Sequence, residues 1–193
     1  MSNCIGLFGT CGDSKWRVPF IEKFHSMGIE DGVDFFNPQK DDWKPEDAVI
    51  EAEHLANDSV LCWPVTGETY GLGSLGEVGF SILNSIKMDD RRDFIVMIEL
   101  ELSSEIMVWD RKGKPSRESK ESLRMRALVS EHLKKLRLAN VYVVDNFDQM
   151  LEIALRCYAA NATLAPYRKR FNPHLKNVGS SYFSCSETSF NPI

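Results

Sequence analysis

The chain has 193 residues, a formal net charge of −5 and 43% hydrophobic residues, which is enough for one α/β domain with a sizeable core. The acidic balance argues against a protein that binds duplex nucleic acid, because such a protein needs a basic face. The five cysteines are scattered without a C-x-x-C pair, so we expect reduced thiols rather than a disulfide framework or a metal site such as zinc. We find neither a signal-peptide pattern nor an apolar run near the roughly twenty residues of a membrane span, and we expect a cytoplasmic protein.

Short apolar runs alternate with segments of helical periodicity over residues 4–160. The apolar runs predict five strands, at Ile5–Phe8, Val33–Phe36, Val60–Val65, Phe94–Ile98 and Val141–Val144. Apolar residues at helical spacing predict five helices, at 16–27, 45–56, 75–86, 116–138 and 147–160. Residues 106–109 are predicted as a short additional strand. This alternation indicates an α/β domain whose parallel sheet is covered on both faces.

Local signals predict how these helices begin and which faces they bury. Asp13 or Ser14 is expected to cap the first helix. The second and fourth helices are each expected to bury an apolar stripe. These stripes comprise Ala48, Val49, Ala52, Leu55 and Ala56 in the second helix, and Leu123, Ala127, Leu128, Val129 and Leu133 in the fourth.

Residues 161–193 differ from the domain at 1–160, because they combine Asn, Pro and Ser with aromatic side chains that follow no period. The aromatic residues Phe171, Tyr182, Phe183 and Phe190 favour a tail that docks on the domain or on a neighbouring subunit, since disordered tails are poor in aromatics. A disordered end is the alternative.

Three loops are expected to meet at the carboxyl edge of the sheet, where open parallel sheets bind ligands. They are 9–15, 37–44 and 66–74, and their candidate binding residues are Gly9, Thr10, Asp13, Asn37 and Trp43. The first loop precedes a helix, so its amides could hold an anion such as a phosphate, with a plain tight turn as the alternative. Lys15 and Arg17 could add charge to it, or could lie in a solvated first turn.

The segment Thr66–Ile86 contains five glycines in its first fourteen residues and one carboxylate, Glu77, at a helix start. The spacing Ser74-x-x-Glu77 is that of a capping box. The alternative is functional: a carboxylate in the first helical turn is held ionised by the helix dipole and amides. A fixed, ionised carboxylate suits a nucleophile at a sugar anomeric carbon, whose transition state resembles an oxocarbenium ion.

The run Gly71–Phe80 (Gly-Leu-Gly-Ser-Leu-Gly-Glu-Val-Gly-Phe) resembles the catalytic-glutamate segment of the nucleoside 2-deoxyribosyltransferase family and of related nucleotide N-glycosidases. Three earlier segments are similar to the same family in order and spacing, at 5–10, 35–38 and 51–61. The resemblance covers about residues 4–160 and is clearest over 5–86.

The resemblance implies a flavodoxin-like, doubly wound sheet of five parallel strands in the order 2-1-3-4-5, and cleavage of an N-glycosidic bond without a cofactor. Glu77 matches the family nucleophile, which forms a covalent glycosyl intermediate that passes to another base or to water. An acid–base group would protonate the leaving base. Gly73 and Ser74 match the residues that bind a substrate 5′-phosphate. The base-recognising carboxylate falls near Glu51, with Glu53 as the neighbouring candidate, and a solvated helix face is the alternative for both.

The sequence departs from the family at two positions. The expected aspartate six residues before the glutamate is Gly71, and the expected orienting tyrosine on the first strand is Leu7. Glu68 or Tyr70 is the candidate to take over these roles. Trp16 and Trp43 could stack on a base or sugar, and core packing is the alternative for Trp16.

Three functions therefore stay open. The first is a transferase or hydrolase that acts on the N-glycosidic bond of a nucleoside or nucleotide. The second is a non-catalytic nucleotide-binding module on the same fold, and the third is a flavin-binding flavodoxin-like protein. In each case the expected partner is a small molecule rather than a nucleic acid or a membrane. The resemblance also implies a homo-oligomer, because sites of this family are commonly completed by a neighbouring subunit.

Overall fold

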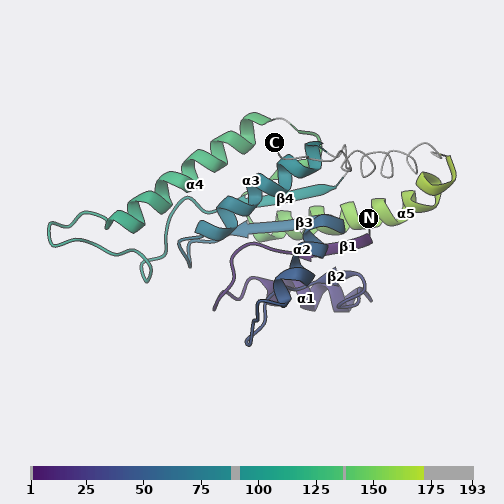
Figure 1. Ribbon diagram of the computed structural model, residues 1–193, viewed down its shortest axis with the longest axis horizontal. Coiled ribbons are helices and arrows are strands. Elements are labelled where there is room, and N and C mark those ends of the chain that lie inside the picture. The colour runs from purple at the N-terminus through teal and green to yellow at the C-terminus, as the bar shows by residue number, and fades with distance from the viewer. Residues whose placement is uncertain (1, 88–91, 137, 172–193) are drawn as a thin grey trace, which may run out of the picture. The chain divides into compact units, whose positions relative to one another are not determined.

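The computed structural model of the chain describes residues 2–87, 92–136 and 138–171. Its sheet is entirely parallel and has the strand order β2-β1-β3-β4-β5 (Figure 1). The strands are β1 (Ser2–Leu7), β2 (Phe35–Phe36), β3 (Asp58–Val65), β4 (Asp93–Ile98) and β5 (Val141–Val143). The helices are α1 (Arg17–Ser26), α2 (Asp47–Asn57), α3 (Leu72–Lys87), α4 (Arg117–Leu136) and α5 (Phe147–Phe171). This confirms the flavodoxin-like α/β fold.

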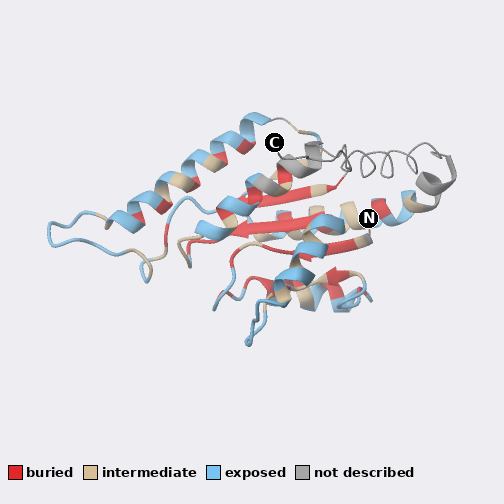
Figure 2. Ribbon diagram, viewed as in Figure 1, coloured by how far each residue is buried: buried red, intermediate tan, exposed pale blue. Residues whose placement is uncertain are grey.

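The central strand β3 is buried along its whole length, as the red ribbon in Figure 2 shows. It pairs with β1 on one side and β4 on the other, and helices cover both of its faces, so its side chains are buried on both sides of the sheet. Val60 and Cys62 belong to one apolar cluster, whereas Leu61, Trp63 and Val65 belong to the second. This alternation is the period of two that a strand imposes on its side chains.

Each cluster is completed by a different set of helices. The first cluster includes Phe20 and Phe24 of α1, together with Met150 and Ala154 from the early turns of α5. The second includes residues of α3 and, from α4, Leu133. Burying one such aromatic or aliphatic side chain contributes about 1.5–3 kcal/mol. The fold therefore rests on two layers of helices around one sheet.

Strand β2 is shorter than predicted, with only Phe35 and Phe36. Val33 lies outside it and is 66% exposed. The preceding Gly32 has a φ of +71°, and its amide donates to the carbonyl of Phe35 at 2.9 Å. A turn over residues 32–34, which begins at this left-handed glycine, therefore occupies the first half of the predicted strand.

The predicted cap of α1 is wrong, although the helix begins within one residue of the predicted start. The helix begins at Arg17, and Trp16 precedes it without a side-chain cap. Ser14 is not the cap because its hydroxyl donates to the carboxylate of Glu68 in another loop, and Asp13 is exposed. Local capping rules assign the Ser14 side chain to the helix, but it makes a tertiary contact instead.

The predicted apolar stripe of α2 is largely wrong, and that of α4 is right only in part. None of the eleven residues of α2, all of them described, is buried, and Val49 is 63% exposed, although Leu55 packs against the second cluster. In α4, Leu133 is buried in the second cluster and Val129 packs against it, whereas Ala127 and Leu128 are exposed. Its buried face is instead a mainly polar stripe at helical spacing, comprising Ser119, Ser122, Arg126, Ser130 and Leu133.

Two further segments differ from the prediction. The strand expected at 106–109 is absent from this described segment, where the one strand-like feature is an isolated bridge between Trp109 and Pro115. Helix α5 does not end at Ala160 but continues to Phe171. The chain separates into two compact units between Tyr158 and Ala159, within this helix. Residues 172–193, including the other tail aromatics at 182, 183 and 190, lie outside the described residues, so docking of the tail stays a prediction.

Candidate functional site

The loops after β1 and β3 are joined directly at the carboxyl edge of the sheet. The Thr10 amide donates to the Pro64 carbonyl at 2.8 Å, and the Thr66 amide donates to the Thr10 hydroxyl at 2.9 Å. Gly9 has a φ of +96°, and a Cβ there would lie 2.3 Å from the Pro64 oxygen. Gly9 and Thr10, which we expected to contact a ligand, therefore hold two loops together.

Arg17 holds the first loop in place through hydrogen bonds to backbone carbonyls. Its side chain is buried and donates to the carbonyls of Leu7 at 3.0 Å and Thr10 at 2.7 Å. Burial lowers the pKa of the Arg17 guanidinium. Trp16 donates to the same Thr10 carbonyl at 2.9 Å and is 5% exposed in the first cluster, where it stacks on Phe147. The core-packing alternative for Trp16 is thus the one that the structure shows, while Arg17 is buried rather than solvated.

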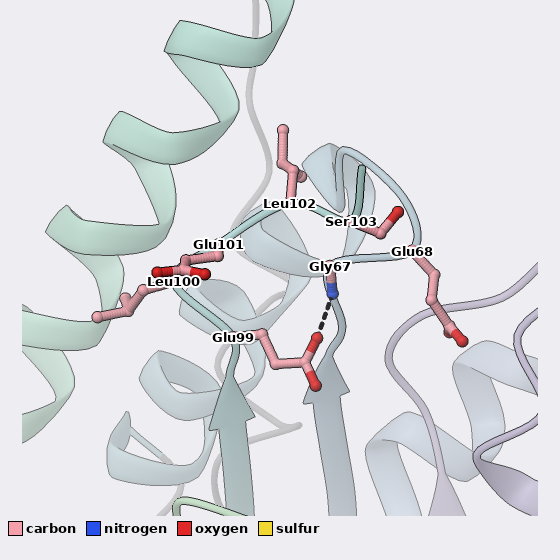
Figure 3. A pocket seen from close by; sticks show the side chains of 7 residues that line it. All are labelled: Gly67, Glu68, Glu99, Leu100, Glu101, Leu102 and Ser103. Atoms are coloured by element: carbon pink, nitrogen blue, oxygen red, sulfur yellow. Dashed lines mark hydrogen bonds between the residues drawn. The ribbon is translucent and has the colours of Figure 1, made fainter. Parts of the chain in front are cut away.

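Glu68 lies in the third loop and is held by two hydroxyl donors. Ser14 donates to it from the first loop, and Thr66 donates to it at 3.1 Å. Glu68 lines an acidic recess of about 420 Å³ between the loops that follow β3 and β4. The lining residues are Gly67, Glu68, Glu99, Leu100, Glu101, Leu102 and Ser103 (Figure 3).

The carboxylates of this acidic recess do not converge. Figure 3 shows Glu68 and Glu101 pointing in different directions from the backbone around Gly67. Glu99 turns inward instead and accepts the amide of Gly67 at 2.5 Å. The recess therefore presents separated charges rather than a cage of oxygens for a cation.

A second recess, of about 470 Å³, lies between the loops after β1 and β2 and the start of α2. Its lining includes three of the expected binding residues, Asp13, Trp43 and Glu51. The Trp43 indole is half exposed and donates to Glu51 at 2.6 Å. The backbone amide of Gln39 donates to the side-chain oxygen of Asn37 at 3.1 Å. The side-chain amide of Gln39 donates to the Gly12 carbonyl at 2.6 Å, which ties this wall to the first loop. An exposed aromatic face beside a carboxylate suits a flat, polar molecule such as a nucleobase.

Glu77 lies in the second turn of α3, because the helix begins at Leu72. The described first turn contains no acid, and Ser74 is its third residue. Both local interpretations of this position are therefore wrong: Ser74 and Glu77 do not form a capping box, and the dipole of the first turn does not hold the carboxylate ionised.

The environment of Glu77 instead favours its neutral form. Glu77 is exposed as a residue, but neighbouring atoms remove part of the water around its carboxyl group. This desolvation, followed by the negative charge of Glu51, raises the pKa of Glu77. The two carboxyl groups thus lie within electrostatic range, which brings Glu77 into the neighbourhood of the second recess.

The two expected partners of Glu77 have no equivalent at the matching positions. Leu7 is fully buried in the core. Gly71 has a φ of +64°, and a Cβ there would lie 2.7 Å from Val65 Cγ1 and 3.0 Å from Arg126 Nη2, so an aspartate does not fit. Tyr70, a proposed substitute, donates its hydroxyl to the Ile106 carbonyl at 3.4 Å and so reaches toward the loop after β4.

Gly73 and Ser74 occupy the first turn of α3, where amides lack partners within the helix. The first helical bond runs from the Leu75 amide to the Gly71 carbonyl at 2.9 Å. Apart from the neighbouring residues and the backbone of the helix itself, no heavy atom of the described residues lies within 4 Å of a Cβ placed on Gly73, so this turn is open to an approaching phosphate.

Sequence reasoning missed Arg126, the residue that shapes the third loop. Its side chain is fully buried and donates to four carbonyls, those of Val65, Thr66, Thr69 and Glu99. The sequence did contain a signal for Arg126, namely the polar stripe of α4, whose residues recur at spacings of three and four. A search for apolar periodicity passes over it because the buried side chains are serine and arginine.

Comparisons with protein-family models, with curated proteins and with solved structures found no match. Within the described residues, no helix combines the length and the apolar character needed to cross a membrane.

Proposed function

We propose that this chain cleaves the N-glycosidic bond of a nucleoside or nucleotide through Glu77, and passes the sugar to another base or to water. The observation that supports this most is the placement of Glu77: a partly desolvated carboxyl group at the carboxyl edge of a flavodoxin-like sheet, within electrostatic range of Glu51. The resemblance of the segment around Glu77 to the deoxyribosyltransferase family points the same way.

In the proposed reaction, the Glu77 carboxylate attacks the anomeric carbon as the bond to the base nitrogen breaks. The bonding electrons leave with the base, which takes up a proton, and a glycosyl ester forms on Glu77. The acceptor then attacks the same carbon, loses its proton and restores the carboxylate. A raised pKa makes the ionised carboxylate more basic and hence a stronger nucleophile. Glu68, held by Ser14 and Thr66, is the candidate proton donor.

The second recess is the proposed seat of the base. The exposed face of Trp43 stacks on the base, and Glu51 accepts a hydrogen bond from its amino or imino group. The hydrogen bond from Trp43 to Glu51 orients both side chains before the substrate arrives. A 5′-phosphate would lie at the first turn of α3, near Gly73 and Ser74. The proposal includes a cytoplasmic homo-oligomer.

The experiment is a panel of deoxynucleosides and their monophosphates, incubated with and without an acceptor base. We expect Glu77→Gln to lower base release by at least about a thousandfold, as the loss of a catalytic nucleophile does. Glu53→Gln is the matched control, because Glu53 is also exposed but lines neither recess; it should leave the rate unchanged. Full base release by Glu77→Gln would show that Glu77 is not the nucleophile.

A second candidate is a non-catalytic nucleotide-binding module on the same fold. The specific observation in its favour is that Gly71 and Leu7 leave no room for the expected partners of Glu77. Tight nucleotide binding by the wild-type chain, without turnover of any member of the panel, would establish it. A flavin-binding protein would be yellow when purified, so a colourless preparation excludes that option.

A further inference from the structure

Three potential metal ligands gather at the amino-terminal edge of the sheet, opposite the edge that carries the recesses. They are Cys4 of β1, His54 in the last turn of α2 and Asp58, the first residue of β3. One sulfur, one imidazole nitrogen and one carboxylate oxygen from these residues all lie within 4.8 Å of one another, and the described residues contain no second such group. We infer that Cys4, His54 and Asp58 form a binding site for a divalent transition-metal cation of the zinc type.

The donor set matches the preference of zinc. Zinc binds thiolate, imidazole and carboxylate at about 2.0–2.3 Å, and three protein ligands leave a fourth tetrahedral position for water or another molecule. Tetrahedral ligands at these bond lengths are about 3.3–3.7 Å apart. His54 Nδ1 is already 3.0 Å from Asp58 Oδ1. Closing the site around a cation therefore requires the sulfur to move inward by no more than about 1.5 Å, while the imidazole nitrogen and the carboxylate oxygen separate by a few tenths of an ångström.

The fold holds the three side chains in place before a cation arrives. Two residues of β1, Asn3 and Cys4, lie opposite one residue of β3, because the register shifts between the Ser2 and Ile5 pairs. Such a bulge redirects the side chains of the longer strand. The His54 ring stacks on Phe36 with centroids 3.8 Å apart and planes 3° apart, which fixes the ring orientation as outer contacts do in known metal sites.

The surroundings of the three side chains give a cation access to them, and they disfavour the thiolate form that a nucleophilic Cys4 would need. Cys4 and Asp58 are buried, while the His54 side chain is 26% exposed and gives access to the site. Burial, then the charge and hydrogen bond of Asp58, and then the charge of Asp34, raise the pKa of the Cys4 thiol well above its usual range. The same carboxylates that disfavour a free thiolate favour a divalent cation beside the sulfur, which then displaces the thiol proton.

The competing explanation is a purely structural network, in which His54 pairs with Asp58 and the Cys4 thiol donates to the carboxylate. This network and a metal site make different use of the sulfur. The network needs only a small donor at position 4, so serine would serve it. A metal site needs the thiolate, because serine is a poor ligand for a borderline-soft cation.

The test is a titration of the tag-free, reduced full chain with Co²⁺, a spectroscopic substitute for Zn²⁺. We expect one Co²⁺ per chain, a near-ultraviolet thiolate-to-cobalt absorption band, and loss of the band when Zn²⁺ is added. Cys4→Ser should abolish the band and weaken binding by more than about tenfold, since even loss of an outer contact costs about 10–100-fold. His54→Gln should weaken binding by a similar factor.

Cys11→Ser is the matched control, because Cys11 is an exposed thiol outside the cluster; it should keep both the band and the affinity. Circular dichroism checks the fold of each variant. Should Cys4→Ser not fold, His54→Gln decides, because its side chain is partly exposed: Zn²⁺ should raise the melting temperature of the wild type and not that of His54→Gln. The inference is overturned if excess Co²⁺ produces no thiolate band in the wild type, or if Cys4→Ser or His54→Gln binds as the wild type does.

Discussion

Replacing Arg126 by alanine should destabilise the chain more than any surface change in the same helix. The guanidinium is fully buried and donates to the carbonyls of Val65 at 3.1 Å, Thr66 at 2.8 Å, Thr69 at 2.6 Å and Glu99 at 2.8 Å. The Val65 carbonyl keeps a second donor, the Glu99 amide at 3.0 Å. The other three carbonyls lose the guanidinium in the variant.

A buried acceptor that loses its donor costs about 1–3 kcal/mol. Three such losses, partly relieved by water that enters the space left by the side chain, give an expected loss of about 3–5 kcal/mol in the free energy of unfolding. That is a large part of the about 5–15 kcal/mol of a typical domain. Arg126→Lys keeps the charge but cannot reach all of these carbonyls from one ammonium group, and it should cost about half as much.

The assay is urea unfolding followed by far-ultraviolet circular dichroism, with tryptophan fluorescence as a second probe of two-state behaviour. Arg124→Ala is the control, because the Arg124 side chain is 70% exposed and lies 3.8 Å from Glu121. It should change the free energy of unfolding by no more than about 0.5 kcal/mol. A loss below about 1 kcal/mol for Arg126→Ala would refute the role assigned to this side chain.

Two further predictions concern Gly9 and Glu77. Gly9→Ala should lower the free energy of unfolding by about 3 kcal/mol or more, and Gly12→Ala by about 1 kcal/mol. Both glycines have a positive φ, but only a Cβ at position 9 meets the Pro64 oxygen. Equal losses for the two variants would contradict this reasoning. Because the folded state raises the pKa of Glu77, ionisation of Glu77 lowers the free energy of unfolding. This loss of stability is absent below the ordinary pKa of 4.5, and it develops as the pH rises through the raised pKa. Glu77→Gln should therefore have a higher melting temperature than the wild type at neutral pH and the same melting temperature in acid. A melting temperature below that of the wild type at neutral pH would contradict this prediction.

The strands of the sheet could be predicted because each long strand appears as a local pattern in the sequence. A parallel strand that is buried on both faces appears as one continuous apolar run, and the run at 60–65 lies within the observed β3, Asp58–Val65. The resemblance supplied the strand order. The strand ends were less predictable, as the turn at Gly32 that shortens β2 shows.

The candidate site was predictable as a set of loops but not as a set of contacts. Chain order places the loops after β1, β2 and β3 at one edge, and there the structure joins Trp43 to Glu51. Local rules failed where a distant partner took the side chain. Ser14 donates to Glu68, which is 54 residues away, and Arg126 reaches Thr69 across 57 residues.

The succession of strands and helices along the chain follows from interactions between residues a few positions apart, so periodicity was enough to predict that succession. The surroundings of Glu77, the buried arginines and the group of Cys4, His54 and Asp58 follow from the register of β1 on β3 and from how α2 and α4 pack on the sheet. Cysteine spacing alone indicated no metal site. Only the tertiary structure brings Cys4 to two ligands about fifty residues further along the chain, because contacts of that range depend on the packing of whole elements rather than on local sequence.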